Sequence, residues 1–427
     1  MIFLVSCGSV KDVKNRPAPI TIKDGVFYKG NEPYYFVGAN YWYGPLIAAR
    51  NIGDRERLIK ELDLMKSNGI DNLRILVGSE GGTQDFQVKP ALQPEQGKYN
   101  EDLLDGLDFL LAEMAKRNMY AVLYLNNNWI WSGGMSAYLE WNGYGEVANP
   151  FLDKYSWEDY FQYTQQFHTC TPCREAFMNH VKFILGRTNQ YTGLKFTDDT
   201  TIMSWQVANE PRIFTEEDRA PFREWLIEVV DLLDDLDPNT LVSTGAEGKA
   251  SYLDDLVEYE RLHQNPKIDY LTAHMWPKNW GWYDIEDEKG SLKISIENAY
   301  LYMNEHADVA RRLNKPLVFS EFGFPREKES LSLDASIENR NEFYEAIFRR
   351  LKESYEKKGI VAGTNFWGFG GFAKTNPNIG KWEKGDDFSG DPPQEPQGLN
   401  TVFAQDESTL ELIKKYNQIV NPGTFQD

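Results

Sequence analysis

The stretch TIMSWQVANEPR, residues 201–212, contains the pattern that decides the fold. Residues 202–206 are apolar or β-compatible and predict a short buried strand, which ends at Asn209, Glu210 and Pro211. Pro211 donates no backbone hydrogen bond and biases Glu210 towards an extended conformation, so the strand cannot continue through it. We therefore expect Glu210 to present its carboxylate to a cleft at the tip of a strand.

A second glutamate follows another buried strand in PLVFSEFGF, residues 316–324. Residues 317–320 predict the strand, and Glu321 comes directly after it. Hydrolysis of a glycosidic bond needs two carboxyl groups, one as proton donor and one as nucleophile or base. The two strand-end glutamates therefore predict that chemistry.

Strands and helices alternate along the whole chain around these two motifs. Strands are expected at residues 35–39, 72–77, 121–125, 202–206, 241–244, 270–273, 317–320 and 361–367. Helices are expected at 54–68, 101–117, 174–187, 216–236, 292–313, 341–358 and 408–416, with a short helical stretch between the fifth and sixth strands. This α/β alternation predicts a single-domain (β/α)8 TIM barrel over residues 20–427, opened by a hairpin of residues 20–28 and 32–35. A doubly wound sheet competes, but no glycine-rich phosphate loop follows the first strand.

Composition narrows the class of partner. The 427 residues carry a formal charge of −20, which argues against nucleic acid and anionic membranes and suits a neutral polymer. Aromatic residues reach 14%, with 12 Trp, and this abundance favours exposed stacking surfaces. No apolar run approaches the 18 or so residues of a membrane span. We expect a monomer.

Residues 1–19 are expected to lie outside the barrel. Residues 4–8, LVSCG, resemble a bacterial lipoprotein box with Cys7 as the lipidated residue, although the basic n-region and most of the apolar h-region are missing. The protein would then lie outside the cytoplasm, on the cell surface or in the periplasm, on a polar tether; otherwise it is secreted. Cys170 and Cys173 predict a local disulfide or free thiols, since no redox-domain pattern surrounds them.

Polar and aromatic residues gather at the predicted strand ends, where the chemistry of such barrels lies. The polar residues there are Asn40, Arg74, Asn126, Asn209, Glu210, His274, Glu321 and Asn365. The aromatic residues are Trp42, Trp129, Trp131, Trp276, Trp280, Trp282 and Trp367. Indoles pack on the apolar faces of sugar rings, while amide, guanidinium and imidazole groups bond sugar hydroxyls. The set predicts a sugar cleft, in which Trp129 and Asn126 contact substrate.

Arg74 lies within NLRILVG, an otherwise apolar strand, and therefore needs a buried anion. A catalytic carboxylate is the natural candidate. We expect Arg74 to keep Glu321 charged, and the charge of Glu321 to raise the pKa of Glu210 so that it acts as an acid. No cluster has metal-ligand spacing, so neither a metal nor a cofactor is expected.

The segments WQVANEPR, HMWPKNWGWYD, FSEFGF and NFWGFGG resemble glycoside hydrolase family 5, in particular its β-mannanase branch. NNNWIWSGGMSAYLEW and GDPPQEPQGLNTVF share this resemblance, which spans residues 26–427. It implies a (β/α)8 barrel and endo-acting, retaining hydrolysis of β-1,4-mannosidic bonds in mannan, glucomannan or galactomannan.

The resemblance also implies roles for single residues. It makes Glu210 the acid/base and Glu321 the nucleophile, with Arg74 holding the nucleophile ionised. Substrate contacts are implied for Asn209 at the 2-hydroxyl, Trp367 as the platform beneath the sugar, and His274, Arg212 and Trp42. Fungal relatives have a tyrosine where this chain has Trp276, whose indole N–H can donate a comparable hydrogen bond but cannot accept one.

Three alternatives stay open. An endo-β-1,4-glucanase or glucomannanase of the same family would use the same carboxylates with differently shaped subsites. A cell-surface glycan-binding lipoprotein, from a different class, would use the tryptophans and the tether but would not need two aimed glutamates. A structural lipoprotein on a barrel scaffold would need neither the glutamates nor the aromatic cleft.

Overall fold

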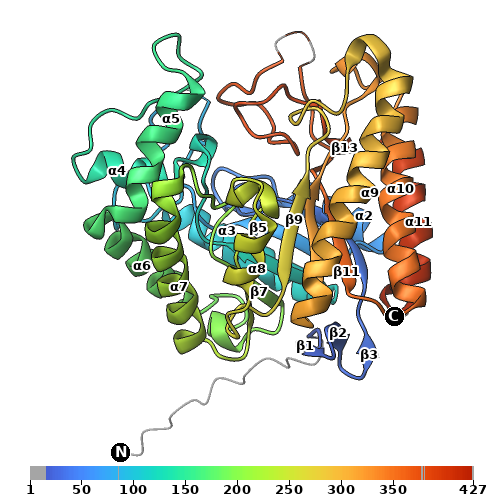
Figure 1. The fold of residues 1–427 in the computed structure, drawn as a ribbon, viewed down its shortest axis with the longest axis horizontal. Helices are drawn as coiled ribbons and strands as arrows, with labels where there is room; N and C mark the ends of the chain where they lie inside the picture. Colours follow the sequence, from blue (N-terminus) through green and yellow to red (C-terminus); the bar gives the residue numbers. More distant parts are fainter. Residues whose placement is uncertain (1–15, 85, 377, 379, 426–427) are drawn as a thin grey trace, which may run out of the picture.

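Within the described residues, which are 16–84, 86–376, 378 and 380–425, eight parallel strands form a barrel (Figure 1). The protein is seen here in a computed structural model. The strands are β4 (Phe36–Asn40), β5 (Asn72–Leu76), β6 (Tyr120–Tyr124), β7 (Ile202–Gln206), β8 (Leu241–Ser243), β9 (Leu271–Met275), β10 (Leu317–Phe322) and β11 (Val361–Phe366). Each lies within two residues of its predicted bounds, so the predicted (β/α)8 fold is confirmed.

The strands follow the order β8–β7–β6–β5–β4–β11–β10–β9. Two backbone hydrogen bonds join β8 and β9, the two ends of this order. The N–H of Asp269 donates to the carbonyl of Val242 at 2.8 Å, and the N–H of His274 donates to the carbonyl of Glu247 at 3.1 Å. Every residue of the eight strands is buried, because helices cover the outside and side chains fill the inside. This burial explains why the strands read as continuous apolar runs.

Amphipathic helices cover the barrel. They are α2 (Arg55–Ser67), α3 (Glu101–Lys116), α6 (Thr171–Leu185), α7 (Arg219–Leu236), α8 (Leu256–His263), α9 (Glu288–Leu313), α10 (Glu338–Glu356) and α11 (Glu407–Val420). In α3, the Asn100 side chain caps the first turn by accepting from the backbone N–H of Asp102, and the buried leucines recur at helical spacing. No helix of the described residues is long and apolar enough to cross a membrane.

The N-terminal hairpin differs from its prediction. Residues 20–28 are not one strand, because β1 (Ile20–Lys23) and β2 (Val26–Lys29) are separate and pair with each other antiparallel. Asp24 and Gly25 both have positive φ, 51° and 72°, and form the tight turn between them. β3 (Glu32–Pro33) then pairs with β2. Cys7 and most of the predicted tether lie outside the described residues.

The loops at the carboxyl ends of the strands are long and carry elements of their own. These are α1 (Gly44–Ala48), α4 (Gly134–Trp141), α5 (Trp157–Thr164) and the pair β12 (Phe369–Gly371) and β13 (Val402–Phe403). Figure 1 shows the loops around α5 and before β13 rising at one end of the barrel, with β1 to β3 at the other. Cys170 and Cys173 form a disulfide at the start of α6, which decides between the two alternatives that the sequence left open.

Candidate active site

A cleft of about 600 Å³ opens at the carboxyl ends of the barrel strands. Both strand-end glutamates, Glu210 and Glu321, line it, together with aromatic side chains from several loops. Its volume lies in the range of sites that bind small molecules. The lining residues are Trp129, Trp131, Phe151, Trp157, Phe161, Asn209, Glu210, Arg212, Glu247, Trp276, Lys278, Asn279, Trp280, Glu321, Trp367, Gln394, Glu395 and Pro396.

Glu321 lies near the end of β10, where the pairing with β9 shifts between Phe319 and Glu321. This irregularity brings Glu321 opposite His274 of β9. Oε1 of Glu321 accepts a hydrogen bond from Arg74 at 2.5 Å. The buried anion that the sequence required for Arg74 is therefore Glu321.

The Arg74 guanidinium is held rigidly by further acceptors. Its Nε donates to Gln206 Oε1 at 2.8 Å, and its two terminal nitrogens donate to Asn209 Oδ1 at 2.8 Å and Asn40 Oδ1 at 3.2 Å. Arg74 is fully buried and also stacks over the Tyr124 ring at 4.4 Å. These partners come from β4, β6 and the end of β7, so the barrel interior itself orients the cation that faces Glu321.

Glu210 follows β7 and has φ of 52°, in the left-handed region. The expectation that Pro211 would hold Glu210 extended is therefore wrong. Tertiary contacts override the local bias: the backbone N–H of Glu210 donates to the carbonyl of Gly245 at 3.0 Å. Its carboxylate bonds Nδ1 of His274 at 2.6 Å through Oε1 and accepts from the Trp129 indole through Oε2.

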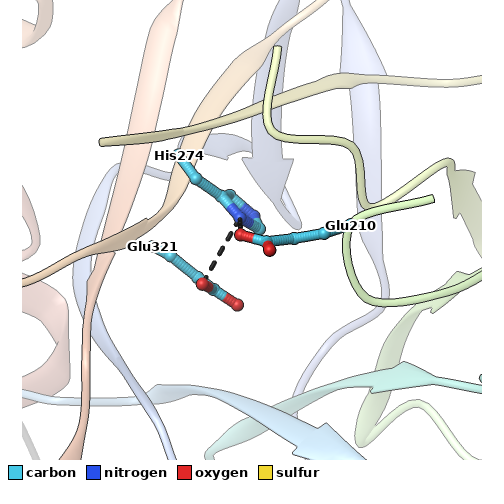
Figure 2. Close-up of side chains that lie close together, drawn as sticks. All are labelled: Glu210, His274 and Glu321. Carbon is cyan, nitrogen blue, oxygen red and sulfur yellow. Dashed lines mark hydrogen bonds and ion pairs between the residues drawn. The ribbon is translucent and has the colours of Figure 1, made fainter. Parts of the chain in front are cut away.

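His274 contacts both glutamates, and Figure 2 shows the three side chains converging. Its Nδ1 is also 3.4 Å from Oε2 of Glu321, and its Nε2 is 3.0 Å from the Ser320 hydroxyl. Burial lowers the pKa of His274 to about 4, so the imidazole is neutral at neutral pH. An ionised carboxylate can only accept a hydrogen bond. Nδ1 of His274 therefore carries the hydrogen and donates it in a hydrogen bond to Glu210, while Nε2 accepts a hydrogen bond from the Ser320 hydroxyl.

The pKa order of the two glutamates in the free site is the reverse of that expected from the sequence. Burial raises the pKa of Glu321 well above its usual range, and the charge of Glu210 raises it further, against the opposing effect of Arg74. Burial also acts to raise the pKa of Glu210, but the hydrogen bond and charge of His274, with Arg212 and Trp129, lower it to about 2. The donors around the Glu210 carboxylate therefore favour its ionised form, and the two carboxyl groups titrate as a coupled pair.

The predicted tryptophans differ in their access to the cleft, and Trp282 is not among the residues that line it. Trp129, Trp131, Trp276, Trp280 and Trp367 line the cleft. Trp42 does not: it is 1% exposed, its indole N–H donates to the Gly390 carbonyl at 2.9 Å, and it packs edge-on against Trp131. Trp42 therefore supports a wall of the cleft from behind.

Trp276 and Trp367 meet edge-on, with ring centroids 5.9 Å apart. The hydrogen bonds of the described residues include none from the Trp276 indole to Glu321, although the resemblance allowed for one. The buried Trp367 indole nitrogen likewise has no hydrogen-bond partner in the described part of the chain. Both residues line the cleft, so their rings can contact a ligand.

The three other predicted contact residues differ in their access to the cleft. Arg212 lines the cleft, stacks over the Trp129 ring at 4.8 Å and pairs with Glu247. Asn209 also lines it, and its amide nitrogen donates to Asn127 at 3.1 Å. Asn126 is fully buried beneath the lining, and its backbone carbonyl accepts from the N–H of Asn209 at 2.8 Å.

Several residues of the cleft were not found from the sequence. Glu247 lies only three residues beyond the predicted end of the fifth strand, so its position near a strand end could have identified it. Gln394 and Glu395 lie in the proline-rich loop before β13, where no strand end or spacing marks them. Burial, followed by the charges of Asp391 and Glu210, raises the pKa of Glu395 to about 8, so its carboxyl is mostly protonated at neutral pH.

Among the described residues, Glu210, His274 and Glu321 offer one ligand atom each within 4.8 Å of one another, a spacing that could hold a metal ion. Both carboxylates, however, already have cationic neighbours. Arg74 bonds Glu321, and Arg212 acts electrostatically on Glu210. These two positive charges oppose the binding of a further cation.

A barrel that carries a pair of buried glutamates at its strand ends, in a cleft lined by indoles, defines a glycoside hydrolase. The chain belongs to glycoside hydrolase family 5, in the group described as beta-mannosidase-like, whose profile matches residues 18–423. The resemblance predicted from the sequence is thereby confirmed.

Individual relatives agree with this assignment. The chain is similar to "Mannan endo-1,4-beta-mannosidase 7" of Arabidopsis thaliana, with 27% identity over 78% of this chain and 74% of that protein. It is similar to "Mannan endo-1,4-beta-mannosidase 4" of Oryza sativa subsp. japonica, with 28% identity over 78% of this chain and 69% of that protein. The crystal structure of a glycoside hydrolase family 5 mannosidase from Rhizomucor miehei matches with a TM-score of 0.87 and 33% identity, over 95% of this chain and 98% of that chain.

Proposed function

We propose that this protein hydrolyses β-1,4-mannosidic bonds within mannan, glucomannan or galactomannan with retention of configuration. Glu321 is the nucleophile and Glu210 the acid/base. The observation that carries this proposal is the spacing of the pair: an oxygen of Glu210 and one of Glu321 lie within 4.8 Å in the cleft. Retaining enzymes hold their carboxyl groups about 5–5.5 Å apart, whereas inverting enzymes need about 6.5–9.5 Å to admit a water.

The reaction proceeds in two displacements. Glu321 attacks the anomeric carbon while Glu210 gives its proton to the departing oxygen, which forms a glycosyl–enzyme ester and releases the leaving group. Glu210 then takes a proton from a water molecule, whose oxygen attacks the anomeric carbon and frees Glu321. Arg74 stabilises the carboxylate of Glu321 before attack and after release.

The productive complex needs the proton on Glu210 rather than on Glu321. In the free site, hydrogen bonds from His274 and Trp129 favour the ionised form of Glu210, so substrate binding has to favour its protonated form instead. A glycosidic oxygen placed beside Glu210 provides an acceptor for that proton, and Arg74 stabilises the charge of Glu321.

The choice of mannose rests on the relatives. Two are named mannan endo-1,4-beta-mannosidases, and a further Rhizomucor miehei structure, 32% identical over 95% of this chain, is titled as a complex with mannosyl-fructose. The words "mannosidase" and "beta-mannosidase-like" favour a second candidate, the release of single mannose units from chain ends. The same two glutamates would serve it.

The test compares reducing-sugar release from linear mannan, glucomannan and carboxymethylcellulose, with the Glu210→Ala protein as control. We expect preference for mannan, with a mixture of oligosaccharides as early products. Early release of mannose alone would favour the second candidate, and preference for carboxymethylcellulose would overturn the substrate. Inactivity on all three would favour a glycan-binding protein.

We also propose that Cys7 carries a lipid anchor and that the enzyme acts as a monomer outside the cytoplasm, on the bacterial cell surface or in the periplasm. The LVSCG sequence at residues 4–8 supports the anchor. Cells that express the full gene should incorporate labelled palmitate into the protein, and Cys7→Ser should abolish the labelling. Equal labelling of both forms, or of neither, would contradict the anchor at Cys7.

A further inference from the structure

The loop that leads into β13 forms part of the cleft wall although it contains neither a helix nor a strand. We call residues 389–401 the wall loop, because Gln394, Glu395 and Pro396 within it line the cleft. Three of its residues are proline, and each proline fixes its own φ. A buried loop without regular structure has to pair its backbone groups through side chains. The side chains that do so determine the shape of this part of the wall.

Asp391 joins the two ends of the wall loop. Its carboxylate accepts from the backbone N–H groups of Gly398 at 2.8 Å and Asn400 at 3.1 Å, and from the Thr401 hydroxyl at 2.6 Å. Asp391 is only 1% exposed. Arg340 of α10 donates to the Thr401 carbonyl at 3.0 Å, which ties this end of the loop to the helices around the barrel.

Gln397 joins the middle of the wall loop. Its amide nitrogen donates to the carbonyls of Asp391 at 3.1 Å, Pro392 at 2.9 Å and Glu395 at 3.1 Å. Its amide oxygen accepts from the Ser389 hydroxyl at 2.9 Å. Gln397 is 3% exposed, so its buried partners depend on this one side chain for their hydrogen bonds.

Two side-chain oxygens of the wall loop have no partner. Oε1 of Gln394 and Oε2 of Glu395 are buried without a hydrogen-bond partner in the described part of the chain. Unpaired buried oxygens cost free energy, and a mobile loop would turn them towards water. Their position in the wall therefore indicates that other contacts impose the shape of the loop, and the contacts of Gln397 are the most central of these.

We propose that Gln397 is a positioning residue, which holds the wall loop in one shape so that Gln394 and Glu395 stand in the cleft wall before substrate binds. This inference rests on the proposed function, because it takes a mannan chain as the ligand of the cleft. An ordered wall removes the entropy cost of ordering the loop during binding. Loss of the Gln397 contacts should therefore raise KM and leave kcat nearly unchanged, since the hydrogen bonds of Gln397 reach neither Glu210 nor Glu321.

The experiment compares Gln397→Met, which keeps the length of the side chain but removes its donors, with Asn189→Leu as the matched control. Asn189 is also a buried amide that pairs a loop, through Asp108, Tyr191 and Thr192, and it does not line the cleft. KM for mannohexaose should rise about fivefold in Gln397→Met with kcat within about twofold, while Asn189→Leu should change neither by more than about twofold. An equal rise of KM in both variants, or a rise in neither, would overturn the positioning role.

Hydrogen–deuterium exchange tests the wall loop without catalysis. The backbone amides of residues 397–401 all donate hydrogen bonds, and they should exchange about tenfold faster in Gln397→Met, while those of residues 188–195 should not change. Asp391→Asn, which removes acceptors at the loop ends, should give the same pattern and replaces Gln397→Met if that protein does not fold. Unchanged exchange would overturn the inference whatever the kinetics show. If the unaltered protein hydrolyses no mannan, the proposed function fails, and exchange alone decides whether Gln397 holds the loop.

Discussion

Glu321 and Glu210 face the same cleft but are held by different parts of the molecule. Glu321 lies on a barrel strand, and its partner Arg74 is buried among amide groups of the barrel interior. Glu210 lies on a loop in left-handed backbone, and Trp129, from the loop after β6, donates to its carboxylate. The barrel strands thus orient the nucleophile Glu321, whereas residues on loops set the pKa of the acid/base Glu210. Changes near Glu321 should cost stability and rate together, and changes near Glu210 should alter mainly its proton affinity.

The largest expected effects separate the two glutamates by leaving group. Glu321→Ala should abolish hydrolysis of every mannoside, because no ester can form. Glu210→Ala should lose about 10²–10⁴-fold on mannan but far less in the first step on 2,4-dinitrophenyl β-mannoside, whose leaving group needs no proton. Burst and steady-state kinetics measure both. Equal losses on both substrates in Glu210→Ala would contradict its role as acid.

Arg74→Lys should lower both activity and stability. Lysine keeps the charge but cannot bond Glu321, Gln206 and Asn209 at once, so several buried acceptors lose their donor. We expect kcat/KM to fall about 100-fold and the free energy of unfolding to fall by about 3–5 kcal/mol. Denaturant unfolding and steady-state kinetics measure the two quantities.

Arg187→Lys is the matched control for Arg74→Lys. Arg187 makes two hydrogen bonds to Asp108, at 2.8 and 2.7 Å, and does not line the cleft. It should lose stability while its kcat/KM stays within about twofold of the starting value. An Arg74→Lys protein that lost stability but kept full activity would refute the link between Arg74 and the nucleophile.

Trp129→Phe should move the pH–activity curve to higher pH. The indole hydrogen bond lowers the pKa of Glu210, so its removal raises that pKa, and the pair titrates as a unit. Both the acidic and the basic limb of the plot of kcat/KM against pH should move to higher pH, by about one pH unit at most. Trp157→Phe, which changes a ring that packs on Trp129 but bonds neither glutamate, should leave the limbs in place. A downward shift in Trp129→Phe would contradict the assigned hydrogen bond.

The smallest effect is expected from removing the disulfide that lies near the loops around Glu210. Cys170→Ser with Cys173→Ser opens a loop of only a few residues, so the free energy of unfolding should fall by about 2 kcal/mol. Neither cysteine lines the cleft, so kcat/KM should stay within about twofold. A large loss of activity without loss of stability would indicate that the disulfide orients the loops that carry Trp129.

The sequence by itself determined the barrel and the two glutamates. Each strand is a short run of mostly apolar or β-compatible residues, so local pattern was sufficient to find all eight within two residues. Arg74 could be paired with a buried anion because a charge inside an apolar strand has few other ways to be stable.

Only the tertiary structure decided the pKa values of the two glutamates. Trp129 and Glu210 are 81 residues apart, and their hydrogen bond depends on two loops meeting above the barrel. Such contacts also set the left-handed backbone of Glu210, the protonated state of Glu395 and the burial of Trp42. Strand patterns arise from neighbours along the chain, whereas pKa values and cleft shape arise from groups that only folding brings together.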